Sequence, residues 1–218
     1  MRKSYIRLVP FVFSYNIMTT FDKLVDIFRQ FPGIGPRQAK RFVFFLLSRD
    51  PSFLNEFTEL ISVLKREILQ CKSCFRFFQK RSGETVCSIC GDPNRTTSEL
   101  MLVVKDTDLE AMEKSGMYFG KYFVLGGTIA LFEKKNAPAF RVKELEARVA
   151  KDAKAGALKE VILALSANPD GEHTGEELKR TLSQYSIKIS TLGRGLSTGS
   201  ELEYADKETI TSALKNRG

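Results

Sequence analysis

The sequence predicts a multidomain α+β protein with an N-terminal helical module, a small cysteine-bearing module, and an α/β domain with a mostly parallel sheet. Three observations support this fold class. Apolar residues recur at helical spacing through residues 18–70. All four cysteines of the 218-residue chain lie between residues 71 and 90. From residue 100 onward, short apolar runs alternate with longer amphipathic segments, as strands alternate with helices in α/β domains.

The charge of the chain is concentrated in its N-terminal half. Residues 1–99 carry 16 Lys and Arg against 9 Asp and Glu, a balance of +7, whereas residues 100–218 carry 18 against 17, a balance of +1. A basic half indicates a polyanionic partner, nucleic acid first. Excess lysine that serves only solubility is the alternative. No apolar stretch approaches the length of a transmembrane helix, so no membrane partner is expected.

Residues 1–17 stand apart from the rest of the chain. Basic residues precede the apolar stretch from Leu8 to Tyr15, which is similar to a weak signal peptide, but Pro10 interrupts it and no small-residue cleavage site follows. Two interpretations are open: a disordered extension, or an over-read upstream of a start at Met18. Without an export signal and with paired thiols, the protein is expected in the cytoplasm, associated with the nucleoid.

Three helices are expected in residues 18–70. The first is amphipathic and ends at Pro32–Gly33, and the second runs from Pro36 to Ser48 with proline in its first turn. The third follows Asp50, and its apolar residues repeat along one face. These residues are Phe53, Phe57, Leu60, Ile61, Leu64 and Ile68.

The segment between the first two helices is a candidate phosphate-binding element. Gly33 and Gly35 permit a tight hairpin and let backbone N–H groups approach a ligand, while the start of the next helix adds partial positive charge. The candidate DNA-binding residues are Gly33, Ile34, Gly35, Arg37, Lys40 and Arg41. Such an element binds phosphates without reading bases. A plain helical corner inside a core is the alternative.

The cysteines form two matched pairs, Cys71-x2-Cys74 and Cys87-x2-Cys90. Two such knuckles can direct four thiolates to one point and build a closed, tetrahedral, structural zinc site. Unrelated thiols or two disulfides are the alternatives, but a chain of this length does not need disulfides to fold. The aromatic residues of this module (Phe75, Phe77 and Phe78) are interpreted as core or oligomer contacts rather than base-stacking groups.

The C-terminal region alternates strands and helices. The expected strands are 100–104, 122–125, 161–165 and 187–192, and the expected helices are 109–114, 142–154 and 174–185. This order predicts a mostly parallel sheet covered on both faces.

Taken in order, a helix-hairpin-helix, a four-cysteine zinc finger and a Toprim-like α/β domain resemble the RecR family of recombination mediators. The resemblance covers about residues 19–217, and four segments carry it. These are residues 32–39 (PGIGPRQA), 90–95 (CGDPNR), 122–127 (YFVLGG) and 195–206 (GLSTGSELEYAD). The boundaries predicted from it are 18–70 for the helix-hairpin-helix domain, 71–95 for the finger, 96–192 for the Toprim-like domain and 193–218 for a glycine-rich signature with a helix.

The resemblance implies a protein without catalytic residues that forms a dimer or a tetrameric ring around DNA. With RecO-like and RecF-like partners, such a protein helps load the RecA recombinase at gaps. Two other functions stay open from the residues: a Toprim-type, magnesium-dependent nuclease or primase-like enzyme, and a zinc-ribbon adaptor that binds protein.

Departures from the family pattern argue against magnesium. Lys105 stands where Toprim enzymes carry a glutamate, and the segment from Asn168 to Thr174 is about two residues shorter than usual and is expected to form a loop. A cation at this position would repel Mg²⁺. A rotated metal site built from Asp106, Asp170 and Glu172 stays open as an alternative. The nearby acidic residues are expected instead to bind a basic partner or the finger of another subunit. They are Asp106, Asp108, Asp170 and Glu172.

Overall fold

The structure, a computed structural model, describes residues 18–81, 83–129, 140–193, 195–196, 199 and 201–215. The interpretations of residues 1–17 concern a segment outside these ranges. The chain divides into two compact units, of which the first ends at Leu64 and the second begins at Lys65. Each unit is described by itself.

The N-terminal unit is built from the helices α1 (Thr20–Phe28), α2 (Pro36–Leu47) and most of α3 (Pro51–Glu67). Thr19 starts α1 with a capping box, because its hydroxyl accepts from the Asp22 N–H at 3.2 Å and the Asp22 carboxylate accepts from the Thr19 N–H at 3.2 Å. The α1–α2 core is small. Its buried residues are Val25, Ala39 and Val43.

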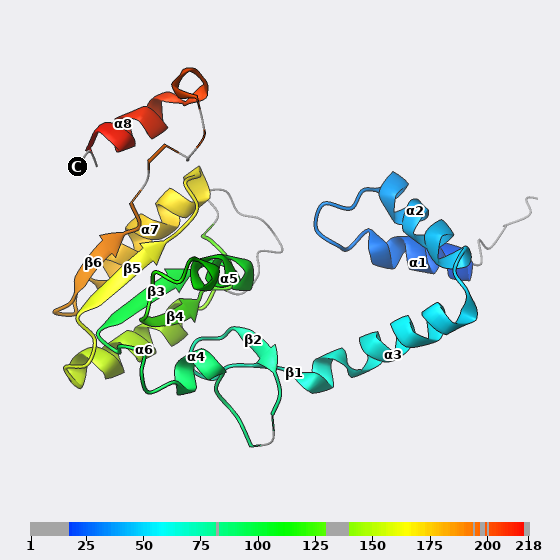
Figure 1. Cartoon of the computed structure of the whole chain (residues 1–218), viewed down its shortest axis with the longest axis horizontal. Coiled ribbons are helices and arrows are strands. Elements are labelled where there is room, and N and C mark those ends of the chain that lie inside the picture. Colours follow the sequence, from blue (N-terminus) through cyan, green and yellow to red (C-terminus); the bar gives the residue numbers. More distant parts are fainter. Residues whose placement is uncertain are drawn as a thin grey trace, which may run out of the picture. The chain divides into compact units, whose positions relative to one another are not determined.

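The second unit contains a parallel sheet of β3 (Glu99–Val103), β4 (Lys121–Val124), β5 (Glu160–Ala164) and β6 (Lys188–Thr191). Their spatial order is β4-β3-β5-β6, and every neighbouring pair is parallel (Figure 1). The predicted fold class is therefore confirmed. The connections contain α5 (Asp106–Ser115), α6 (Val142–Lys154) and α7 (Pro169–Leu182).

The alternation of side chains along β3 gives the sheet two separate cores. Leu100 and Leu102 face one core with buried residues of α6 and α7, such as Leu145 and Leu178. Met101 and Val103 face the other core with Leu109 of α5, and this second core also contains the cysteines. The finger thus takes the place of a covering helix on one face of the sheet.

The finger comprises β1 (Ile68–Gln70), β2 (Phe77–Gln79) and the short helix α4 (Ser88–Gly91), with β1 and β2 antiparallel. After the last strand of the sheet, the chain forms the 3₁₀ helix η1 (Leu202–Tyr204) and the helix α8 (Lys207–Lys215). In the part of the chain that the structure describes, no helix is both long and apolar enough to cross a bilayer.

The prediction of a loop from Asn168 to Thr174 is wrong, because all residues of this segment except the first lie on α7. Asn168 is the N-cap, and its side-chain oxygen accepts from the Gly171 N–H at 2.8 Å. Pro169 occupies the first helical turn, where a missing N–H costs no hydrogen bond. Asp170 and Glu172 therefore lie in the first turn of a helix, next to its positive end.

Candidate metal centre and nucleic-acid interface

The four cysteines converge on one point. Cys71 follows β1, Cys74 lies in the turn after it, and Cys87 is the N-cap of α4, which carries Cys90. All four sulfur atoms lie within 4.8 Å of one another, and Cys74 Sγ is 3.6 Å from Cys87 Sγ. Four thiolates around zinc at about 2.3 Å have S···S separations of roughly 3.8 Å. The arrangement fits a structural zinc ion with a full set of protein ligands.

Backbone groups and neighbouring thiols favour the ionised form of Cys71. Its sulfur accepts from the Ser73 N–H at 3.4 Å and from the Cys87 N–H at 3.3 Å. Hydrogen bonds from the thiols, that of Cys74 first, hold the pKa of Cys71 far below its usual range. The same bond raises the pKa of Cys74. A zinc ion at this point would supply the positive charge that four neighbouring thiolates need in order to coexist.

A lysine from the sheet supports the second knuckle. Lys121, at the start of β4, is 7% exposed, and its ammonium donates to the backbone carbonyls of Ile89 at 3.0 Å, Cys90 at 3.2 Å and Asp92 at 2.8 Å. These carbonyls end α4, where a cation is favourable. The sequence reasoning missed this residue. A charged residue at the head of the apolar run 122–125 was the available signal, because a strand covered on both faces rarely begins with an unpaired lysine.

Two further contacts attach the finger to the α/β domain. Arg148 of α6 donates to the Ser73 carbonyl at 3.1 Å and to the Ser73 hydroxyl at 2.6 Å. The Val124 N–H of β4 donates to the Cys74 carbonyl at 2.8 Å. Finger and sheet therefore form one packed body within the second unit.

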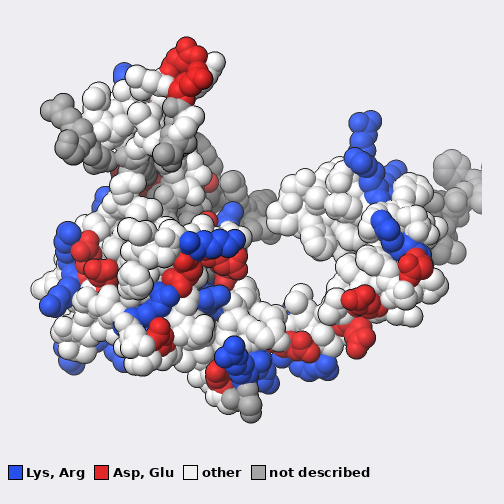
Figure 2. Space-filling model, in the orientation of Figure 1, with Lys and Arg blue, Asp and Glu red and all other residues white. Residues whose placement is uncertain are grey.

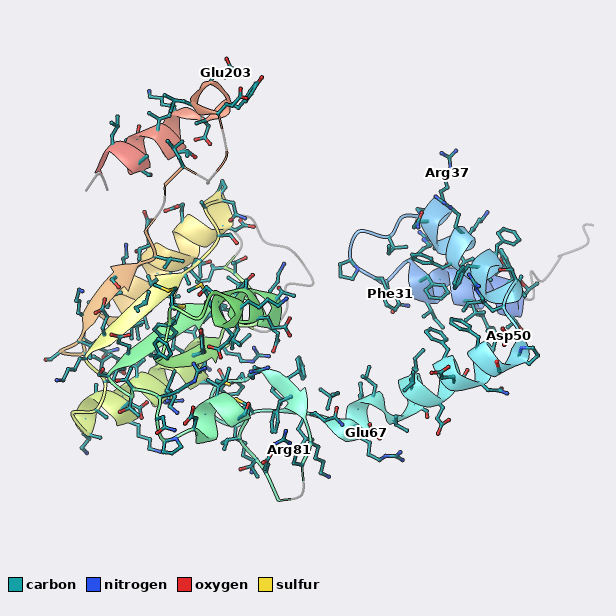
Figure 3. The ribbon with its side chains drawn as sticks, in the orientation of Figure 1. Phe31, Arg37, Asp50, Glu67, Arg81 and Glu203 are labelled. Atoms are coloured by element: carbon teal, nitrogen blue, oxygen red, sulfur yellow. The ribbon has the colours of Figure 1, made fainter. Side chains whose placement is uncertain are left out.

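The glycine hairpin of the N-terminal unit brings together the six candidate DNA-binding residues. Gly33 adopts φ +78°, which favours glycine, and Gly35 is the N-cap of α2 without a side chain to cover the first N–H groups. Arg37, Lys40 and Arg41 are all exposed on the first turns of α2, and Arg37 points away from the helix (Figure 3). The first turn holds no acidic residue. The arrangement can bind phosphate oxygens through backbone N–H groups and cations together.

The four acidic residues predicted to bind a partner have local structural contacts. The Asp106 carboxylate accepts from the Phe77 N–H at 2.8 Å, which ties β2 to the start of α5. The Asp108 carboxylate accepts from the Lys105 N–H at 2.9 Å and caps its own helix. Asp170 and Glu172 lie on α7. Over the described ranges, only the cysteines bring three or more metal-ligating side chains together. Partner binding by these acids stays a prediction.

Comparisons with known proteins agree with this architecture. Residues 21–64 match the family model of the RecR helix-hairpin-helix, residues 98–193 match the Toprim domain, and residues 195–217 match the RecR C-terminal model. The recombination protein RecR of Chloroflexus aggregans is 36% identical over 203 residues, which cover 93% of this chain and 95% of that protein. RecR of Bacteroides thetaiotaomicron is 37% identical over 196 residues, 90% of this chain and 92% of the relative.

RecR of Streptococcus uberis is 35% identical over 199 residues, 91% of this chain and 96% of that protein. These relatives thus align with nearly the whole chain, through the helical unit, the finger and the parallel sheet. The chain belongs to the family of the recombination protein RecR.

Proposed function

We propose that this protein is a DNA-binding mediator of recombinational repair, without catalytic activity of its own. The observation that carries the proposal is the exposed cationic start of α2 beside the glycine hairpin, in a chain of the RecR family. Backbone N–H groups there would bind one phosphate, and Arg37, Lys40 and Arg41 would bind its neighbours. Contacts of this kind give affinity for any sequence, as a mediator that acts at gaps anywhere in a genome requires.

The apolar surface of the N-terminal unit supports a homo-oligomer. A groove of about 410 Å³ is lined almost wholly by apolar side chains of the three helices and of the hairpin between α1 and α2. Three of these side chains are exposed, namely Phe31, Phe45 and Phe57. An exposed apolar groove of this kind is typical of an interface between chains. A second copy of the chain is the proposed occupant, and a dimer or a tetrameric ring would let DNA pass through the assembly.

The Toprim-like domain is proposed to serve in docking. Lys105 is exposed at the N-cap of α5, where its charge disfavours Mg²⁺. The acidic residues Asp106, Asp108, Asp170 and Glu172 would face a basic partner such as a RecO-like protein, and a RecF-like protein is the other proposed partner. Together these proteins would help load a RecA-type recombinase at the nucleoid, in the cytoplasm.

A salt titration tests the DNA contacts. The double variant Arg37→Glu and Arg41→Glu should weaken binding to duplexes of unrelated sequence about equally. It should also flatten the plot of log affinity against log salt by about 0.9 for each phosphate that the variant no longer binds. The matched control reverses two exposed lysines of α6, Lys143 and Lys154, and changes the net charge equally.

Equal DNA affinities in the two double variants would show that the DNA site lies elsewhere on the protein. Weak binding without salt dependence would favour the zinc-ribbon adaptor. Incubation with supercoiled DNA and Mg²⁺ tests the enzymatic alternative, since nicking by the purified protein would overturn the non-enzymatic proposal.

A further inference from the structure

The finger contains three phenylalanines, which differ in how far their side chains are buried. Phe75 packs against Phe123 with ring centroids 5.2 Å apart and lies under the Arg141 guanidinium at 5.3 Å. Phe78 packs against the core that contains the cysteines. Phe77 lies between them in the sequence but is 54% exposed. Phe75 and Phe78 therefore fit the sequence interpretation as core residues, whereas Phe77 is not a core residue.

Strand pairing gives Phe77 polar neighbours. Phe77 is opposite Gln70 in the β1–β2 ladder, and Gln79 follows two residues later, so the three side chains share one face of the hairpin. We call Gln70, Phe77 and Gln79 the finger face. The backbone beneath the ring is anchored, because the Phe77 N–H donates to Asp106 Oδ1 at 2.8 Å. The aromatic ring is thus presented outward from a supported strand rather than from a free loop.

The segment that carries the finger face is basic. Residues 65–86 carry six Lys and Arg against two Asp and Glu, a balance of +4 within a chain of net charge +8. The basic residues are Lys65, Arg66, Lys72, Arg76, Lys80 and Arg81. All except Arg76 are exposed, and within the described ranges none of the six is held in a salt bridge. Figure 2 shows Lys and Arg side chains on the finger at the lower edge of the view, and Figure 3 labels Arg81 there.

We propose that the finger face is a second nucleic-acid site, which binds an unpaired strand. Phe77 stacks on an exposed base, the amides of Gln70 and Gln79 hydrogen bond to base edges, and exposed cations of the same segment lie against phosphates. An unpaired strand fits better than a duplex, because a base accepts an aromatic ring on its face only when that face is not covered by its neighbour. It also fits better than a protein surface, because a segment with a balance of +4 attracts a polyanion.

The site is separate from the glycine hairpin, since it lies on the second unit. The proposal of this site rests on the proposed function in one respect only, namely that the ligand is DNA. At a gap, the junction between duplex and single strand offers both kinds of DNA to one protein. The hairpin would bind the duplex phosphates, and the finger face would bind the unpaired strand.

The test compares Phe77→Ala with Phe119→Ala, an equally drastic change at an exposed phenylalanine of the same unit (69% exposed). The affinity for a short oligothymidylate should fall about 5- to 100-fold in Phe77→Ala only, the range expected when one base–aromatic stack is removed. The affinity for a blunt duplex should change less than about twofold in both. Equal zinc content and equal melting temperature show that both variants remain folded.

A fluorescence experiment tests stacking directly. The chain contains no Trp, so Phe77→Trp introduces a single indole whose emission a stacked base should quench. Oligothymidylate should quench Phe77→Trp strongly and the control Phe119→Trp weakly. Charge reversal at Lys80 and Arg81 should lower the salt slope for the single strand by about 0.7 for each phosphate that is no longer bound.

Equal oligothymidylate affinity in the two alanine variants, or equal quenching of the two tryptophans, would overturn this inference. So would a change in oligomer mass of Phe77→Ala without DNA, which would assign the face to a protein contact. These outcomes are distinguishable from failure of the proposed function, which concerns duplex binding by Arg37 and Arg41. Either site can fail while the other stands.

Discussion

Replacing Lys121 with methionine should destabilise the finger and speed the release of zinc. Methionine keeps most of the side-chain volume but removes the ammonium group that donates to the carbonyls of Ile89, Cys90 and Asp92. Each hydrogen bond to a charged group contributes about 1.5–3 kcal/mol. The variant also avoids burying an ammonium group, which offsets part of this loss. We expect a net decrease of about 2–4 kcal/mol in the free energy of unfolding.

Two measurements follow from this magnitude. A loss of about 2–4 kcal/mol in a chain of this size corresponds to a melting temperature lower by about 5–15 °C. Zinc release to a metallochromic chelator should become about tenfold faster or more, because the carbonyls that Lys121 holds belong to the knuckle that carries Cys87 and Cys90.

The control is Lys159→Met, which changes an exposed lysine just before β5 in the same unit. It should match the wild-type protein in both melting temperature and zinc release. If Lys121→Met behaves like this control, the three carbonyls are satisfied by water in its absence. Lys121 would then not support the second knuckle.

Two more changes test the α/β domain. Alanine is normally favoured over glycine in a helix, but Gly171→Ala should lower the free energy of unfolding by about 1–3 kcal/mol, because the new Cβ would lie 2.1 Å from the Ser166 carbonyl oxygen. Gly175→Ala on the same helix meets no such clash. In urea unfolding, this control should be as stable as the wild-type protein or more stable. The hydrogen bond from Ser190, followed by that from a neighbouring lysine, lowers the pKa of Glu160. The ionised carboxylate therefore contributes less than about 1 kcal/mol to the free energy of unfolding. This contribution is present above the unfolded-state pKa and is lost as the pH falls through the folded-state pKa. Glu160→Gln should therefore be less stable than wild type at neutral pH and equally stable in acid, and a constant difference across pH would contradict this.

Short-range patterns in the sequence were sufficient for the architecture and for the metal site. The Cys-x2-Cys pairs predicted the cluster because each knuckle is a local turn, and two such turns need only one close approach. The glycine hairpin and the parallel sheet were likewise readable from turn residues and from the periods of helices and strands. The start of α7 was missed although Asn168–Pro169 is a local helix-start signal.

Tertiary structure decided which charged and aromatic side chains serve the finger. Lys121 reaches carbonyls 29–32 residues away, and Arg148 reaches Ser73 across 75 residues. The sequence by itself showed neither pairing, nor that Asp106 anchors β2 while Phe77 faces outward. The physical reason is that periodicity and turn chemistry act between near neighbours. Partners far apart in the chain are selected only when the finger packs on one face of the sheet and buried polar groups must find hydrogen bonds there.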